Sequence, residues 1–383
     1  YASVTGTTSL AILEATPTLS VSLSSSSVYF GNASPMISTS STSTGTISFS
    51  SSDTSVATIN NSTGSITLVG IGTTTFTINQ ASTANYKSTS TTTSLTINLG
   101  TPALSGFALS SSSVVYGATA PTITAPTSPS SGAITYTSSN TAVATVSGST
   151  ITIVGIGSTT FTATQAANGN YGSASTTTTL TVTAATPSLT ASLSATSVAY
   201  AGTAPTLSYT SPSSGAVTYT SSNTAVATVS GSTITIVGVG STTFTATQAA
   251  NGNYDTATST VTLTVTTATP TLSGFALSSS SVVYGASAPT ITAPTSPSSG
   301  ALSYTSSNTA VATVSGSTIT IVGIGTTTFT ATQAANGNYA SGTATASLTV
   351  TAATPTLSGF AISSSSIVYG AAAPTITAPT SAS

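Results

Sequence analysis

Residues that could carry out chemistry are few in this sequence and lie far apart. The charged residues are Glu14, Asp53, Lys87 and Asp255, and there is no histidine and no cysteine. A nucleophilic triad needs a base, glycosidase-type catalysis needs paired carboxylates, and zinc needs histidine, cysteine or carboxylate ligands. Since none of these sets can be assembled, we predict no catalytic residues, no metal ligands, no cofactor-binding residues and no cofactor. We therefore expect that the chain is not an enzyme.

Calcium is the metal that a few scattered carboxylates could still help to bind. Its sites collect about six to eight oxygen ligands, several of them from carboxylates. Asp53 and Asp255 occur singly, and they occupy non-equivalent positions in the repeats that organise the chain. We therefore interpret both as solvated loop residues.

Two recurring motifs allow both a chemical and a structural interpretation. Gly155-Ile156-Gly157 resembles part of a phosphate-binding loop, but no lysine and no helical pattern follow it, so we expect a turn between strands. Gln165 could in principle form a covalent side-chain crosslink with threonine. Such bonds usually need acidic or histidine helpers, so we expect an ordinary hydrogen bond between strands instead. The equivalent glutamines are Gln80, Gln248 and Gln333.

Amide and hydroxyl side chains give two further candidate sites. Asn32, Asn60 and Asn61 lie in Asn-x-Ser/Thr sequons, which we interpret as chance occurrences, and O-linked sugars on threonine-rich faces are equally conceivable. The threonine runs at residues 176–179 and 326–328 suggest a surface for ice or carbohydrate. A flat, regular Thr-x-Thr ladder across many strands is not evident from the sequence, so we expect solvated strand faces.

These candidates recur because the chain is a tandem repeat. Residues 136–171 return almost unchanged at 219–254 and 304–339, and a looser copy covers 49–86. A unit of this length suits a small β-sandwich domain better than a helical solenoid repeat. Both ends fall inside a unit, so we expect a segment of a longer chain. The predicted parts are 1–14, the C-terminal strand of a preceding repeat; repeats 1 to 4 at 15–99, 100–184, 185–267 and 268–352; and 353–383, the N-terminal part of a further repeat.

Short stretches of alternating apolar and polar residues predict strands and no helix. In repeat 2, Ile134 alternates with polar neighbours on one strand and Phe161 on a later one, while Asn168-Gly169 is the best hairpin turn signal. Seven or so such strands, with turns every ~8–12 residues, favour a two-sheet sandwich. We expect Tyr136 to be the largest core side chain of its repeat.

The start of each repeat differs in length by one residue. Repeats 2 and 4 and the last segment carry Gly106, Gly274 and Gly359 there, whereas repeats 1 and 3 lack one residue. An extra residue in a strand would turn every later side chain to the other face. We therefore expect a β-bulge at each of these glycines.

The composition limits the partners of the chain. Charged residues are 1% of the sequence, against about 25% in ordinary soluble domains. One lysine cannot neutralise a nucleic-acid backbone, and no apolar run approaches the ~20 residues of a membrane helix. We therefore predict no nucleic-acid partner and no membrane insertion. A net charge of −2 gives little repulsion between copies, which favours homotypic contacts.

The sequence also resembles a known family. The run Tyr-Thr-Ser-Ser-Asn-Thr-Ala-Val-Ala-Thr-Val, followed by Ile-Thr-Ile-Val-Gly-Ile-Gly-Ser-Thr-Thr-Phe-Thr-Ala, is similar to the signature of group 2 bacterial immunoglobulin-like domains. The resemblance covers residues 136–164 and their copies, with Tyr136 standing where tryptophan is commoner. It implies an all-β fold of tandem immunoglobulin-like β-sandwich domains in a linear array. It also implies an extracellular, cell-surface or virion-surface location, as in adhesin stalks, phage virion proteins and filament proteins.

Together these observations predict a structural extracellular stalk or filament protein. We expect it to self-associate, to present an adhesive tip, or to do both. The alternative is a glycan- or receptor-binding adhesin module with a cell-surface or glycan partner. In that case the loops of one repeat should diverge from the others, whereas those of repeats 2 to 4 are nearly identical.

Overall fold

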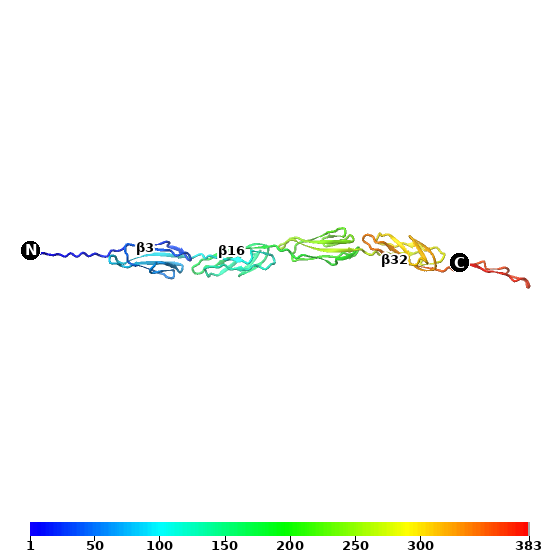
Figure 1. The fold of residues 1–383 in the computed structure, drawn as a ribbon, viewed down its shortest axis with the longest axis horizontal. Coiled ribbons are helices and arrows are strands. Elements are labelled where there is room, and N and C mark those ends of the chain that lie inside the picture. The colour runs from blue at the N-terminus through cyan, green and yellow to red at the C-terminus, as the bar shows by residue number, and fades with distance from the viewer. Residues whose placement is uncertain (382–383) are drawn as a thin grey trace. The chain divides into compact units, whose positions relative to one another are not determined.

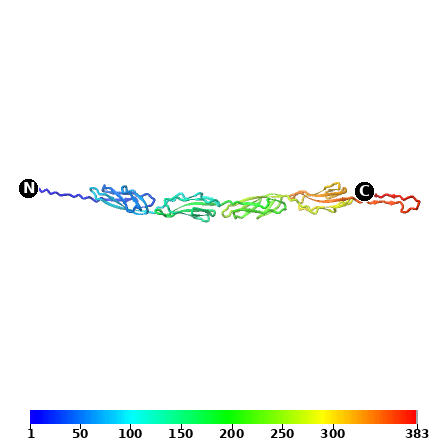
Figure 2. The same ribbon diagram turned by 90° about the horizontal axis from the view of Figure 1, so that it is seen from below.

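The computed structural model describes residues 1–381, and all the regular secondary structure of these residues is β-strand. Figures 1 and 2 accordingly show only strands and their connecting loops. The chain divides into two compact units. The first contains Tyr1–Thr186 and Asn251–Asp255, and the second contains Pro187–Ala250 and the residues from Thr256 onward. The last two residues of the predicted segment 353–383 lie outside the described residues.

Eight strands recur in the same order in each repeat. In repeat 1 they are β1 (Leu19–Leu23), β2 (Ser27–Tyr29), β3 (Ile37–Ser41), β4 (Ile47–Ser51), β5 (Ala57–Ile59), β6 (Ile66–Leu68), β7 (Gly72–Gln80) and β8 (Thr89–Asn98). In repeat 2 they are β9 (Ala108–Leu109), β10 (Ser113–Val115), β11 (Ile123–Thr124), β12 (Ile134–Ser138), β13 (Ala144–Ser147), β14 (Thr150–Ile153), β15 (Gly157–Gln165) and β16 (Ala174–Thr183).

The second unit continues the series. Repeat 3 contains β17 (Thr190–Leu193), β18 (Ser197–Ala199), β19 (Leu207–Thr210), β20 (Val217–Ser221), β21 (Ala227–Ser230), β22 (Thr233–Ile236), β23 (Gly240–Gln248) and β24 (Ala257–Thr266). Repeat 4 contains β25 (Ala276–Leu277), β26 (Ser281–Val283), β27 (Ile291–Thr292), β28 (Leu302–Ser306), β29 (Ala312–Ser315), β30 (Thr318–Ile321), β31 (Gly325–Gln333) and β32 (Gly342–Thr351). After it come β33 (Leu357–Ser358), β34 (Ala361–Ile362), β35 (Ile376–Thr377) and β36 (Thr380–Ser381).

Each repeat is a sandwich of one four-stranded sheet and two short ladders. In repeat 2 the sheet order is β10-β16-β15-β12, with β10 parallel to β16 and the other pairs antiparallel. The second layer pairs β9 with β11 and β13 with β14. The other three repeats have the same pairing. The fold is therefore all-β, with immunoglobulin-like β-sandwich domains in tandem, as the sequence predicted.

The core of each sandwich lies between these layers. In repeat 2, Phe161 and Leu180 from the four-stranded sheet pack with Val143 and Ile151 from the other layer. Phe161 is fully buried, whereas Tyr136 is only half-buried and stacks on Phe107 with ring centroids 5.8 Å apart. The expectation that Tyr136 is the largest core side chain is therefore wrong. The hydroxyl group of Tyr136 stays near water, so Phe161, whose ring has no polar atom, occupies the centre of the core.

The glycines at the start of repeats 2 and 4 interrupt a ladder without shifting its register. Gly106 has φ of +79°, as a left-handed position requires. Ser105 still pairs with Thr127, and Ala108 pairs with Thr124, so two residues are unpaired on each strand. The expected one-sided bulge is therefore wrong. Both strands carry one extra residue, and because the insertions are matched, every later side chain keeps its face.

The two end segments have few partners among the described residues. Residues 1–14 form no strand, and Ala15 bridges to Tyr86. In residues 353–381, β33 pairs with β36 and β34 with β35. No helix among the described residues is long and apolar enough to cross a membrane. The predicted repeat boundaries stay predictions.

Candidate functional site

The carboxylate of Asp53 bonds within the turn in which it lies. Asp53 Oδ1 accepts hydrogen bonds from the backbone N (2.9 Å) and Oγ (2.5 Å) of Ser55, and these bonds lower the pKa of the Asp53 carboxyl. Asn140 holds the equivalent turn in repeat 2 by accepting from Ala142 N at 3.1 Å. Asp53 therefore caps a turn that needs an acceptor and no charge. No group of three or more His, Cys, Asp or Glu side chains that could hold a metal occurs among residues 1–381.

The recurring glutamine is a buried tie between a strand and a loop. Gln165, which is 2% exposed, donates from Nε2 to Ser130 O (2.9 Å) and Gly132 O (3.1 Å), and its Oε1 accepts from Ser128 Oγ at 2.5 Å. Gln80 and Gln248 make the same three bonds in their repeats. Gln165 therefore makes hydrogen bonds, as expected, but to a serine hydroxyl and backbone carbonyls of the loop between β11 and β12 and not between neighbouring strands. In repeat 4, Gln333 keeps both donated bonds, and its buried Oε1 has no partner among the described residues.

Two of the sequon asparagines serve the turn between β5 and β6. Asn60 Oδ1 accepts from Ser62 N at 3.0 Å and from Thr63 N at 2.9 Å. Asn61 Oδ1 accepts from Phe49 N at 3.1 Å. Both side chains therefore help to hold this turn, and the interpretation of the sequons as chance occurrences stays a prediction.

The Gly-x-Gly motif is a turn at the start of β15, as expected. Only the second glycine, Gly157, takes a positive φ, of +128°. A Cβ on Gly155 would lie 2.8 Å from Ala142 O and 3.3 Å from Asn253 Oδ1. The first glycine is therefore required by close backbone approach, and the amide of Ile156 between them donates to Asn253 Oδ1 at 3.0 Å.

Threonine and serine cover the outer face of the four-stranded sheet. We call the outward residues of β12, β15 and β16, and their equivalents in the other repeats, the threonine face. Its members in repeat 2 are Thr135, Thr137, Ser158, Thr160, Thr162, Thr164, Ser175, Thr177, Thr179 and Thr181.

The strand register brings these hydroxyl residues together in rows. Thr160 lies opposite Thr179, and Thr162 lies opposite both Thr177 and Thr137. Comparable pairs in repeat 1 hydrogen-bond, as Thr73 Oγ1 and Thr96 Oγ1 do at 3.0 Å. The outward threonines are exposed or half-exposed, as expected for solvated strand faces, and they also form a Thr-x-Thr ladder that was not evident from the sequence. The ladder spans three adjacent strands, and the sequence hides it because β12 and β15 are far apart in the chain.

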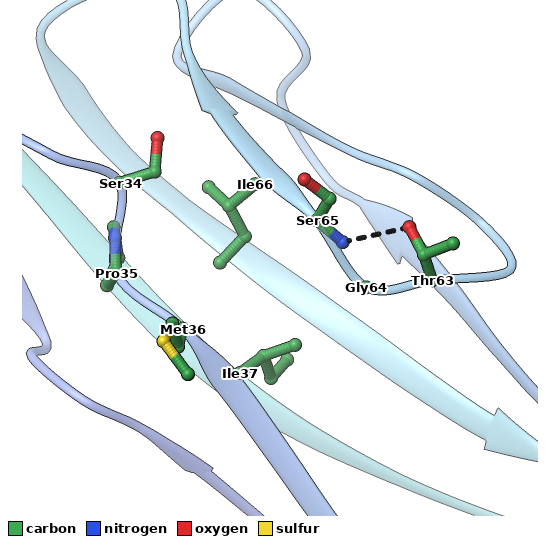
Figure 3. Close-up of a pocket in the computed structure, with 8 residues that line it drawn as sticks. All are labelled: Ser34, Pro35, Met36, Ile37, Thr63, Gly64, Ser65 and Ile66. Carbon is green, nitrogen blue, oxygen red and sulfur yellow. Dashed lines mark hydrogen bonds between the residues drawn. The ribbon is translucent and has the colours of Figure 1, made fainter.

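A shallow hollow of about 290 Å³ lies between the start of β3 and the β5–β6 ladder in repeat 1 (Figure 3). Ile37 and Ile66 line it, Ser65 N donates to Thr63 Oγ1 at 3.4 Å beside it, and Met36 is 73% exposed. Repeat 3 has an equivalent hollow of about 370 Å³. Among the described strands β3 pairs with β1 and β6 with β5, so no ladder closes this gap. The hollow is therefore a feature of the fold.

No protein-family model matches this chain, and no curated protein matches it. Several solved structures are similar. Domains 1–6 of the surface layer protein SbsC match with a TM-score of 0.27 and 18% identity, over 83% of this chain and 51% of that chain. Sidekick-1 immunoglobulin domains 1–5 match with a TM-score of 0.26 and 12% identity, over 88% and 77%. Drosophila N-cadherin EC1-4 matches with a TM-score of 0.23 and 12% identity, over 81% and 93%.

Proposed function

We propose that this chain is a structural, non-enzymatic protein of the extracellular or cell-surface space, a stalk or filament built from group 2 bacterial immunoglobulin-like repeats. The observation that carries the proposal is the recurrence of one uncharged threonine face on all four repeats. Recognition or catalysis needs one specialised site, whereas a spacer needs only repeated copies of the same domain. Four repeats with the same strand pairing, three of them nearly identical in sequence, fit the second requirement.

The threonine faces also favour contacts between copies of the chain. Burying hydroxyl groups against each other avoids the desolvation of charge, which is the costly step when ionic surfaces meet. None of the strands contains lysine, the residue that most often prevents a sheet edge from pairing with another chain. We therefore expect lateral self-association in addition to the spacer role.

Light scattering of the 383-residue chain tests this expectation. The apparent mass should rise with concentration, and one lysine per repeat on the threonine face should abolish the rise at low salt. The face variants are Thr77→Lys, Thr162→Lys, Thr245→Lys and Thr330→Lys, and the controls place lysine at exposed turns as Ser62→Lys, Ser149→Lys, Ser232→Lys and Ser317→Lys. A monomer at all concentrations would refute self-association and leave the spacer role standing.

The surface location has a separate test. In cells that produce the chain, protease added outside the intact cell should degrade it, while a cytoplasmic marker stays whole. Complete protection of the chain would contradict the extracellular assignment.

The alternative, a glycan- or receptor-binding module, is favoured by one feature of repeat 1. Its hollow carries the exposed Met36, where the other repeats have Thr122, Thr206 and Thr290, and its β5–β6 turn is longer. A glycan array with the full chain tests this reading. Binding that disappears in Met36→Thr would support it, and no binding in either protein would exclude the glycan form.

A further inference from the structure

Two recurring sequence motifs, to which the proposed function gives no role, contact each other between repeats. The first is the Gly-x-Gly loop, called here the joint loop, at residues 70–72, 155–157 and 238–240. The second is the Asn-Gly-Asn-Tyr turn, called here the joint turn, at residues 168–171, 251–254 and 336–339. The contacts described next pair each joint loop with a joint turn that lies about one repeat further along the chain.

In the first unit, the side chain of Asn170 bridges two backbone groups of repeat 1. Its Oδ1 accepts from Ile71 N at 3.1 Å, and its Nδ2 donates to Val69 O at 3.1 Å. Such a pair of bonds fixes both the position and the rotation of the amide plane. Gly100 N, in the connection between the repeats, donates to Asn170 O at 3.0 Å.

The tyrosine of the same turn supplies an apolar contact. Tyr171 packs edge-to-face on Phe30, with ring centroids 5.4 Å apart and an angle of 84° between the planes. A Cβ on Gly31 would lie 3.2 Å from Tyr171 Oη, and one on Gly100 would lie 3.2 Å from Tyr171 Cδ1. The neighbouring glycines therefore make room for the ring. Edge-to-face aromatic pairs contribute about 0.5–1.5 kcal/mol beyond their buried area.

The second unit repeats this arrangement with different residues around it. Asn338 Oδ1 accepts from Val239 N at 2.9 Å, and Tyr339 packs on Tyr200 at 5.5 Å and 85°. Within the first unit, Asn253 Oδ1 accepts from Ile156 N at 3.0 Å, and Tyr254 packs on Tyr116 at 5.7 Å and 83°. The same amide bond and the same ring angle thus occur three times.

The equivalent joint loop of repeat 4, at residues 323–325, shows what the turn covers. Among the described residues no joint turn contacts it, and its middle residue, Ile324, is 62% exposed. The equivalent Ile71 and Ile156, which contact a turn, are both 41% exposed. The aromatic ring beside the joint loop follows the same trend. Tyr284 in repeat 4 is 48% exposed, whereas the equivalent Tyr116 and Tyr200, which pack on the tyrosine of a joint turn, are half-buried.

We propose that the joint loop and its adjacent aromatic ring form a recognition surface for an Asn–Tyr turn of the following repeat, and that this pairing holds repeat 2 on repeat 1, and repeat 4 on repeat 3, in one orientation without a metal ion. The surface offers one N–H donor and one aromatic face, with a carbonyl acceptor as well beside Asn170. The partner offers the complementary amide and a second ring. No charged residue belongs to the contacts of Asn170 or Asn338, so a divalent cation has no ligand set there.

This inference rests on the tandem organisation and not on the proposed surface location, so either can fail without the other. The test compares the full chain with its Asn170→Ala, Asn338→Ala double variant. Hydrogen exchange of the Ile71 and Val239 amides should become roughly 3- to 10-fold faster, because each loses one hydrogen bond. Electron micrographs should show a wider spread of angles between repeats 1 and 2 and between repeats 3 and 4.

The matched control is Asn168→Ala with Asn336→Ala. These asparagines lie two residues earlier in the same turns, but their Nδ2 groups donate to Ser131 Oγ and Ser299 Oγ inside their own repeats. The control should leave the Ile71 and Val239 amides and the angles unchanged. Exchange in β16 and β32 reports whether repeats 2 and 4 stay folded in every variant. Asn170→Asp keeps the acceptor for Ile71 N and loses the donor to Val69 O, so it should give an intermediate effect.

Three results would overturn the proposal. The first is unchanged exchange and unchanged angles in the Asn170→Ala, Asn338→Ala protein. The second is an equal effect of the control pair, which would assign the change to folding of the turn. The third is loosening of the unmodified chain by a chelator to the same degree, which would show that a metal holds the repeats.

Discussion

At the scale of single residues, the core depends on where a polar atom can remain near water. Phe161 has no polar side-chain atom and is fully buried, whereas Tyr136 is half-buried against Phe107. Sequence periodicity placed both residues on inward faces. It could not rank them, because the ranking depends on how deep each strand lies in the sandwich.

Phe161→Ala should therefore destabilise repeat 2 by about 3–5 kcal/mol, the usual cost of removing a buried phenylalanine, and Tyr136→Ala should cost less. Hydrogen exchange of β16 in low denaturant measures both changes. β24 and β32 differ from β16 in sequence and report on other repeats, so they serve as internal controls. An equal or larger loss of stability in Tyr136→Ala would show that Tyr136 belongs to the core.

Gln165→Leu should cost roughly 2 kcal/mol, because it removes three hydrogen bonds of a buried side chain and leaves the half-buried carbonyls of Ser130 and Gly132 without their donor. The same exchange measurement follows the change, and Thr164→Ala on the outer face is the control. Intact mass should match the sequence, with no loss of ammonia. A mass deficit in the unmodified chain would instead indicate the crosslink.

At the scale of elements, nearly all strands could be predicted from the sequence, because turn residues and alternation are local signals. The short pairs β9 with β11 and β25 with β27 could not, since their interruption depends on two insertions that match across a ladder. One signal was available. Repeats 2 and 4 carry Ala125-Pro126 and Ala293-Pro294 where repeats 1 and 3 are one residue shorter, and proline cannot donate to a ladder.

One turn carries a residue that its backbone does not favour. Ala201 has φ of +60°, where the other repeats have glycine, and Gly117 has φ of +80° with open space around its missing Cβ. A left-handed conformation costs a residue with a Cβ about 1–2 kcal/mol, partly offset by the lower chain entropy of alanine.

Ala201→Gly should therefore stabilise repeat 3 by roughly 0.5–1 kcal/mol, and Gly117→Ala should destabilise repeat 2 by a similar amount. Exchange of β24 reports the first change and exchange of β16 reports the second. If both substitutions shift stability in the same direction, backbone strain is not the cause.

At the scale of the whole molecule, the contact between repeats was not predicted from the sequence. Ile71 and Asn170 are 99 positions apart, and each motif alone has an ordinary explanation as a turn. Their relation appears only when one repeat is placed against the next. The rows of the threonine face were not predicted for a similar reason, because they require the register of three strands.

The scarcity of ionisable groups leads to a last prediction, on the pH dependence of stability. Hydrogen bonds from Ser55 lower the pKa of Asp53, so the stability from this carboxylate is present above the unfolded pKa of about 3.9 and is lost as pH falls through the lower folded value. Burial, and secondarily Tyr209, raise the pKa of Tyr219. The unfolded chain then loses its proton first, so stability present below about pH 10 decreases above it.

The melting temperature should consequently vary by less than about 5 °C between pH 5 and 9, fall below pH 4 in repeat 1, and fall above pH 10 in repeat 3. Differential scanning calorimetry across pH 3 to 11 measures the profile. Asp53→Asn, which introduces the residue found at Asn140, should remove the acid change, and Tyr219→Phe should remove the alkaline one. A larger shift inside the neutral range would mean that some other group takes up or releases protons on folding. In that case the scarcity of ionisable side chains would not be enough to explain how the stability of the chain depends on pH.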